Sequence, residues 1–165
     1  MLADVKSTVI PKTLADYTRP ALIIPELRQR DTAGIISELS HALQKEGFVP
    51  DLLPFYHTAL NQEFLGNSAL EYGIAIPHGR LSAVKRLQFA FGRLPQPAAW
   101  GPGKSWPVDM IFLLAVPATD AASYLHLLAS IARLGQQPDT LSELRAAETP
   151  EAIWEVLGRS RIRQD

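Results

Sequence analysis

The run DMIFLLAVP, residues 109–117, is the stretch of sequence that most constrains the fold. Its apolar part, from Met110 to Val116, is rich in aromatic and β-branched side chains and therefore predicts a strand. The run stops at Pro117 and is far too short to span a bilayer. It therefore predicts a strand of a folded domain and not a membrane segment.

Strands and helices alternate on either side of this run. Asp31 and Asp51 are predicted helix caps, and Thr149-Pro150 opens the last helix in the favoured order of cap and then proline. Other strands are predicted at residues 21–25, 73–77 and 87–91, and other helices at 31–47, 51–64 and 121–134. This alternation predicts an α/β fold, a single domain whose mixed sheet carries helices on both faces.

Two local expectations follow from the same patterns. The helix after Asp51 is predicted to turn four residues inward, namely Tyr56, Ala59, Leu60 and Phe64. The end of the chain, residues 158–165, is predicted to be a frayed tail.

Composition narrows the possible functions. Apolar residues make up 47% of the chain and charged residues 20%, as is usual for a soluble globular protein. The net charge of −1 favours neither nucleic acid nor a membrane surface as the main partner. Cysteine is absent, which excludes disulfides, thiolate metal sites and a cysteine nucleophile. The N-terminus lacks the layout of a secretory signal, so a cytoplasmic location is expected.

Three familiar kinds of site lack their motifs. Residues 98–105 resemble a phosphate-binding loop, but Ala98 replaces its first glycine, and Trp106-Pro107 leads into a strand where a helix should follow. No H-E-x-x-H or comparable spacing gathers metal ligands, and no G-x-S-x-G turn presents a serine. We therefore expect neither a metal nor a cofactor.

The run GIAIPHG, residues 73–79, places a histidine at the end of a predicted strand, where sites form in α/β sheets. Pro77 stiffens the approach to His78, and Gly79 adds no side chain beside the imidazole. His78 is therefore the main candidate for a working residue. A histidine that is merely hydrogen-bonded at a strand end is the alternative.

A second histidine lies on the predicted helix 121–134. At helical spacing His126, Ser130 and Arg133 share one side, apart from the apolar residues Leu127 and Ile131. This side is either part of a site or a solvated helix face.

Two stretches, GIAIPHG at 73–79 and YLHLLASIA at 124–132, resemble the two signatures of the fructose/mannitol-type enzyme IIA domain. This family belongs to the phosphoenolpyruvate-dependent phosphotransferase system and includes the nitrogen-regulatory IIA proteins. The resemblance covers about residues 8–157, which we expect to form the IIA-like domain. It implies the enzyme IIA fold and a phosphotransferase that works through a phosphohistidine.

The resemblance also implies roles for individual residues. His78 would be phosphorylated on Nε2 by a phosphocarrier of HPr/NPr type, while a backbone carbonyl holds Nδ1–H. His126 matches the second histidine of the family, which lies beside the first and donates to the phosphoryl group. Ser68 matches a position that is commonly threonine, and its hydroxyl would be a further donor.

The chain departs from the family pattern just ahead of the active turn. Gln62-Glu63 stands where the family usually has Arg-Glu, and Glu71-Tyr72 where it usually has Gly-Asn. The missing arginine would neutralise charge on the phosphohistidine, and glutamine cannot do so. Arg80, directly after the active turn, is the candidate to compensate.

The sequence leaves three functions open. A regulatory, nitrogen-type IIA is favoured, because no IIB or membrane IIC region is recognisable in the chain. A IIA component of a sugar-uptake system is the second reading, and an interaction module that has lost phosphorylation because of Gln62 is the third. The expected partners are the phosphocarrier and either a regulatory target or a IIB domain, with no nucleic acid and no membrane insertion.

Overall fold

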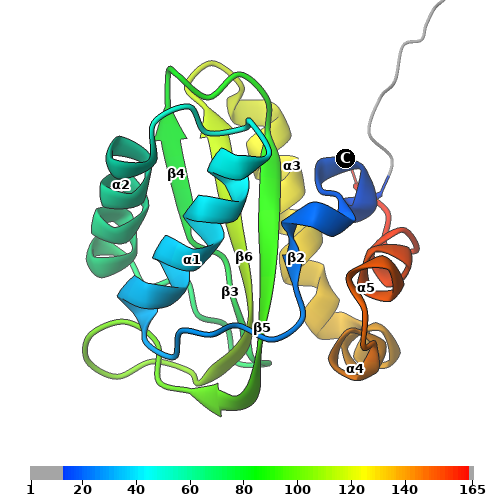
Figure 1. Cartoon of the computed structure of the whole chain (residues 1–165). Coiled ribbons are helices and arrows are strands. Elements are labelled where there is room, and N and C mark those ends of the chain that lie inside the picture. The colour runs from blue at the N-terminus through cyan, green and yellow to red at the C-terminus, as the bar shows by residue number, and fades with distance from the viewer. Residues whose placement is uncertain (1–12, 164–165) are drawn as a thin grey trace, which may run out of the picture.

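A mixed sheet of five strands lies at the centre of the computed structural model, which describes residues 13–163 (Figure 1). The strands follow the order β2 (Ile23–Ile24), β5 (Gln88–Ala98), β6 (Val108–Pro117), β3 (Ile74–Ala75), and β4 (His78–Leu81) also pairs with β6. β5 and β6 are antiparallel, whereas β2, β3 and β4 run parallel to their neighbours. The apolar run is thus the inner strand β6, and all ten of its residues are buried.

Helices cover both faces of this sheet, as the sequence predicts. One face carries α1 (Thr32–Lys45) and α2 (Leu52–Leu65), and the other carries α3 (Ala121–Ala132), α4 (Pro138–Ala146) and α5 (Pro150–Leu157) (Figure 1). No helix within residues 13–163 combines the length and the apolar character that crossing a membrane requires.

The central strand supplies both hydrophobic cores through its alternating side chains. Phe112 and Leu114 belong to the core beneath α3 and α5, whereas Ile111 and Leu113 belong to the core beneath α1 and α2. The inner strand therefore carries apolar side chains on both of its faces, because it lies between two helical layers.

Two of the three predicted helix caps are confirmed by hydrogen bonds, whereas the Asp51 side chain makes no capping bond at the start of α2. Asp31 Oδ1 accepts from the Gly34 N–H at 2.7 Å, and Thr149 Oγ1 accepts from the Ala152 N–H at 3.0 Å. Three short 3₁₀ segments, η1 (Leu14–Tyr17), η2 (Pro20–Leu22) and η3 (Arg133–Gln136), were not predicted, and neither was α4. In α4 only Leu141 and Leu144 are buried, so its apolar signal in the sequence is weak.

The inward face of α2 differs from the prediction. Phe55, Ala59 and Glu63 are buried, whereas Phe64 is 50% exposed. Of the predicted set, Tyr56 and Leu60 are only partly buried. The cause is Glu63, whose carboxylate is hydrogen-bonded inside the protein, so the buried stripe includes a charged residue that apolar periodicity passes over.

The chain end does not fray at residue 158. The Leu14 N–H donates to the Ser160 carbonyl at 2.9 Å, and Thr13 and Arg161 form an antiparallel bridge. The Arg163 N–H also donates to Ser130 Oγ at 3.2 Å. Pairing with the η1 segment therefore orders residues 158–163. Residues 164–165, and residues 8–12 of the expected domain, lie outside the described part of the chain.

Candidate functional site

His78 is the first residue of β4, where the sequence predicts a turn that follows a strand. β3 and β4 both pair with β6, and Ile76-Pro77 separates them because Pro77 has no N–H to donate to the ladder. The Pro77 carbonyl accepts from the Leu114 N–H at 2.9 Å. The backbone that carries His78 is therefore fixed to the central strand.

A pocket of about 320 Å³ lies against the His78 side chain. Its lining includes Gln62 and Glu63 from the end of α2 and Ser68 from the segment that leads to β3. Tyr124 and Leu128 line it from α3. The structure thus brings together three of the sequence-predicted residues: His78, Gln62 and Ser68. In the described part of the chain, no three His, Cys, Asp or Glu side chains are grouped so that they could hold a metal ion.

The aromatic ring beside His78 belongs to Tyr124 and not to a second histidine. The two ring centroids are 5.2 Å apart and the planes are inclined by 43°. An α-helix advances about 100° per residue, so position 126 lies roughly 200° around α3 from position 124. His126 accordingly does not line the pocket. The structure therefore does not bring His126 into the pocket with His78, and Tyr124 lies beside His78 instead.

The imidazole of His78 is favoured in its neutral form. Burial lowers the pKa of His78 below its ordinary value of 6.5, and the nearby positive charge of Arg80 lowers it further. Arg80 is two residues along β4 and therefore on the same side of the strand. Neither ring nitrogen of His78 has a hydrogen-bond partner within residues 13–163, so the expected bond from Nδ1–H to a backbone carbonyl is not formed there.

Replacing Arg80 tests this electrostatic arrangement. In Arg80→Gln we expect the pKa of His78 to rise but to stay below 6.5, because burial, the larger cause, is unchanged. The measurement is an NMR titration of the His78 Cε1–H resonance. Arg86→Gln, which removes a charge that lies over the Phe48 ring, is the control. An unchanged or lower pKa in Arg80→Gln would refute the contribution of Arg80.

Comparison with known proteins places this arrangement in a family. A family model described as "Phosphoenolpyruvate-dependent sugar phosphotransferase system, EIIA 2" matches residues 16–160. The chain belongs to this family. A nitrogen regulatory protein of Bradyrhizobium diazoefficiens is 34% identical over 144 residues, which cover 87% of this chain and 94% of that protein.

Two solved structures share the fold of this enzyme IIA. The nitrogen regulatory protein IIA-Ntr of Neisseria meningitidis superposes with a TM-score of 0.78 at 24% identity, over 87% of this chain and 98% of that chain. The mannitol enzyme IIA of Escherichia coli, in its complex with phosphorylated mannitol enzyme IIB, gives a TM-score of 0.70 at 17% identity, over 84% and 94% of the two chains.

Charge is sparse around His78 in this enzyme IIA. Gln62 lines the pocket with an uncharged amide. Arg80 does not line the pocket, and its Nη2 donates to the Ala118 carbonyl at 2.6 Å in the turn before α3. Its effect on the pKa of His78 shows that the charge is nevertheless felt at the imidazole. Arg80 is therefore a cation that acts on the site from outside the pocket.

A buried carboxylate forms the floor beside His78. Glu63 is 2% exposed and accepts three hydrogen bonds, from the Ser68 N–H at 2.6 Å, the Ser68 hydroxyl at 2.7 Å and Trp100 Nε1 at 2.9 Å. Ser68 Oγ in turn accepts from the Ile76 N–H at 2.9 Å. The Ser68 hydroxyl proton is therefore committed to Glu63, and a role for Ser68 as a phosphate donor would require that bond to break.

The sequence suggests that Gly79 leaves space beside the imidazole, but in the structure it leaves space for a side chain of α2. A Cβ atom at this position would lie 2.6 Å from Cε1 of Phe55, so the glycine makes room for the α2 ring and not for a partner of the imidazole. The close approach of Phe55 to β4 lets α2 pack directly on the strand that carries His78. Gln62 and Glu63 reach the pocket from the end of the same helix.

Tyr72 does not crowd the pocket. Its hydroxyl donates to the Ala132 carbonyl, and its ring packs on Gly135 at the junction of α3 and η3. The bulk that this chain carries where the family usually has asparagine thus ties the segment before β3 to the end of α3.

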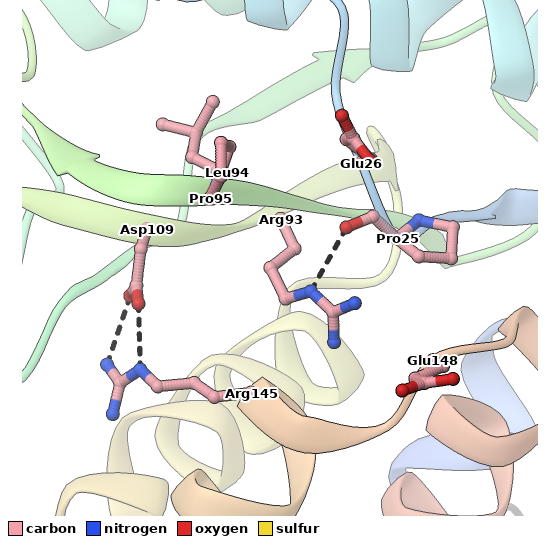
Figure 2. Close-up of a pocket in the computed structure, with 8 residues that line it drawn as sticks. All are labelled: Pro25, Glu26, Arg93, Leu94, Pro95, Asp109, Arg145 and Glu148. Carbon is pink, nitrogen blue, oxygen red and sulfur yellow. Dashed lines mark hydrogen bonds and ion pairs between the residues drawn. The ribbon is translucent and has the colours of Figure 1, made fainter.

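A second pocket, of about 540 Å³, lies at the start of β6 and is held by two arginines (Figure 2). Arg145 pairs with Asp109 at 2.8 and 3.0 Å. Arg93 donates from Nε to the Pro25 carbonyl at 3.0 Å, and from Nη1 to the carbonyls of Leu144 and Ala147. These bonds join the sheet to α4 and to the segment after β2. The two arginines therefore have a structural role.

Proposed function

We propose that this enzyme IIA accepts a phosphoryl group on His78 from a phosphocarrier protein and acts as a regulatory, nitrogen-type member of its family. The observation that carries the proposal is the state of His78. Its imidazole is favoured as the neutral form, its ring nitrogens have no partner in the described chain, and it faces a pocket. A neutral imidazole with a free lone pair is a competent nucleophile at neutral pH.

The proposed step is an in-line phosphoryl transfer. The unprotonated ring nitrogen of His78, Nε2 by family resemblance, forms a bond to phosphorus as the bond between phosphorus and the carrier's donor atom breaks. The electron pair of the broken bond stays on the carrier, and the other ring nitrogen of His78 keeps its proton. Such a transfer needs chiefly alignment and stabilisation of the equatorial oxygens.

The surroundings of the pocket suit a macromolecular donor. Large apolar side chains are exposed next to lining residues, Leu65 at 86% and Leu125 at 57%. Leu65 adjoins Gly66 at the end of α2, and Leu125 adjoins Tyr124 on α3. Exposed apolar groups next in sequence to residues of a reactive pocket are consistent with a protein-docking surface.

Phosphorylation in a defined system tests the proposal. The protein is incubated with phosphoenolpyruvate, enzyme I and either HPr or NPr, and its intact mass is read. We expect one phosphoryl group that is labile in acid and stable in base. A reference IIA protein in the same reaction verifies that the donor is active. If the reference protein is phosphorylated and this protein is not, the proposal is refuted.

The regulatory branch rests on the nitrogen regulatory relatives, and the sugar-uptake branch is the competing assignment. The mannitol IIA structure in complex with phosphorylated IIB supports the expectation that a IIB domain is the partner in that case. Passage of the phosphoryl group to a fructose- or mannitol-type IIB domain would favour sugar uptake. Retention of the group on His78 in the presence of the IIB domain would favour regulation.

A binding module without phosphotransfer is the second candidate, and the uncharged Gln62 in the pocket favours it. We expect Gln62→Arg to increase the phosphorylated fraction at a fixed amount of donor. A guanidinium gives a charge-assisted contact of about 1.5–3 kcal/mol against about 1 for an amide, so the gain is up to about tenfold, less what solvent screens. Mass spectrometry measures the fraction.

Gln44→Arg adds the same charge on α1, outside the pocket, and is the control for this prediction. An equal or lower phosphorylated fraction in Gln62→Arg, with the fold intact, would mean that the charge is supplied elsewhere or is unwanted. The binding module would then be the better proposal.

A further inference from the structure

We infer that the Tyr124 phenol donates a hydrogen bond to the phosphoryl group on His78 and so takes the position expected for a second imidazole. The inference rests on the proposed function of His78. It makes Tyr124 a residue that contacts the transferred group, in a site where the family resemblance had pointed to His126.

Three observations place the Tyr124 ring beside the His78 ring. Its ring lies 5.2 Å from the His78 ring, and both residues line the same pocket. α3 presents Tyr124, Leu128 and Ala132 to this pocket at helical spacing, so the position of the ring is set by a packed helix face. The remainder of that face is apolar, which leaves the phenol as its polar group toward His78.

The hydroxyl of Tyr124 is available as a donor. It has no hydrogen-bond partner within residues 13–163, whereas the Tyr72 hydroxyl, one of the other donors nearby, is bonded to a backbone carbonyl. The Ser68 hydroxyl is bonded to Glu63. Of the two hydroxyl groups that line the pocket, only that of Tyr124 can therefore meet a phosphoryl oxygen without giving up an existing bond.

The phenol also differs chemically from the imidazole that it replaces. Burial raises the pKa of Tyr124 above its ordinary value of 10, while Arg80 lowers it by a smaller amount. The group therefore carries its proton throughout the neutral range and never becomes a cation. With Gln62 also uncharged, the phosphoryl group would be held by neutral donors, and Arg80 would supply the positive charge.

Tyr124→Phe tests the inference because it removes the hydroxyl and keeps the ring. We expect the transfer rate at saturating phosphorylated HPr or NPr to fall about tenfold or more, as for loss of a hydrogen bond to a charged oxygen. The half-saturating carrier concentration should change little. Tyr56→Phe, which removes a phenol from α2 outside this pocket, and His126→Ala should both behave as wild type.

Tyr124→His supplies the rescue. An imidazole donor should recover most of the rate lost in Tyr124→Phe and add an ionisation near pH 6.5 to the rate profile. Wild type should lack that additional ionisation, because the other titratable groups at or near the site (His78, Glu63 and Arg80) are the same in all three proteins. Recovery with the new ionisation supports the donor role, because packing alone would not produce it.

The outcomes separate the inference from the proposal beneath it. Wild-type rates in Tyr124→Phe, or an impaired Tyr124→Phe that Tyr124→His does not improve, would overturn the role of Tyr124 and leave His78 as the acceptor. If the wild-type chain takes no phosphate while a reference IIA does, the proposed function fails and this inference fails with it.

Discussion

Replacing His78 with alanine is expected to abolish phosphorylation of this enzyme IIA. His78 is the imidazole that faces the 320 Å³ pocket, and the hydroxyl of Ser68 in the same lining is bonded to the Glu63 carboxylate. No second histidine lines the pocket. Intact-mass measurement after incubation with the complete donor system should therefore show no phosphoryl group on His78→Ala.

Two control variants, in each of which one other histidine is replaced, test whether this result is specific to His78. His126→Ala and His57→Ala remove histidines that lie outside the pocket, and both should be phosphorylated like the wild type. Far-UV circular dichroism of all three variants checks that the fold persists. Stoichiometric phosphate on His78→Ala, or loss of phosphate in His126→Ala, would assign the acceptor to another residue.

The largest effect on stability is expected at Glu63. Glu63→Ala removes the acceptor for the Ser68 N–H, the Ser68 hydroxyl and Trp100 Nε1, and Trp100 is only 1% exposed. Unpaired buried donors and the cavity left behind should lower the free energy of unfolding by about 3–5 kcal/mol. Urea denaturation measures this, with a shift of the midpoint at constant slope.

The matched control is Glu71→Ala, an exposed glutamate on the segment between α2 and β3, which should change stability by less than about 0.5 kcal/mol. The pH dependence of the stability of Glu63→Gln is a second test. Burial raises the pKa of Glu63 above its ordinary value of 4.5, so the folded state binds a proton more tightly than the unfolded chain. That contribution to stability is full below pH 4.5 and is lost as the pH rises through the folded pKa.

Glu63→Gln should therefore remove this part of the pH dependence. A loss of less than about 1 kcal/mol in Glu63→Ala would mean that the Ser68 and Trp100 donors find other partners, and that the buried carboxylate is not what holds the segment beside His78.

The sheet and its helical layers could be predicted because their signals are local. The apolar run of β6, the Asp31 cap and the Thr149-Pro150 start each act over a few residues, and each has the predicted outcome. The antiparallel pairing of β5 and β6 also agrees with the hairpin loop between them. The choice of His78 follows from the same kind of local pattern.

The composition of the site could not be predicted, because it depends on which side of each helix faces the sheet. A stripe of Phe55, Ala59 and Glu63 is buried only because Trp100 and Ser68 donate to the carboxylate, and these partners are distant in sequence or follow a turn. For the same reason the sequence indicates His126 on α3 as the site residue, whereas the structure places Tyr124 in the pocket. A rotation of roughly 200° on α3 separates a residue in the pocket from one outside it.

The shortness of the outer strands has a consequence for behaviour at high concentration. One edge of the sheet is β2, with two residues, and the other is divided at Pro77 into β3, with two residues, and β4, with four. Within the described residues, neither edge offers the long row of free N–H and C=O groups on which another chain could assemble. Apolar residues such as Leu65, which precedes the pocket-lining Gly66, can then stay exposed with little risk of amyloid-like growth, because contact through side chains alone is readily reversed.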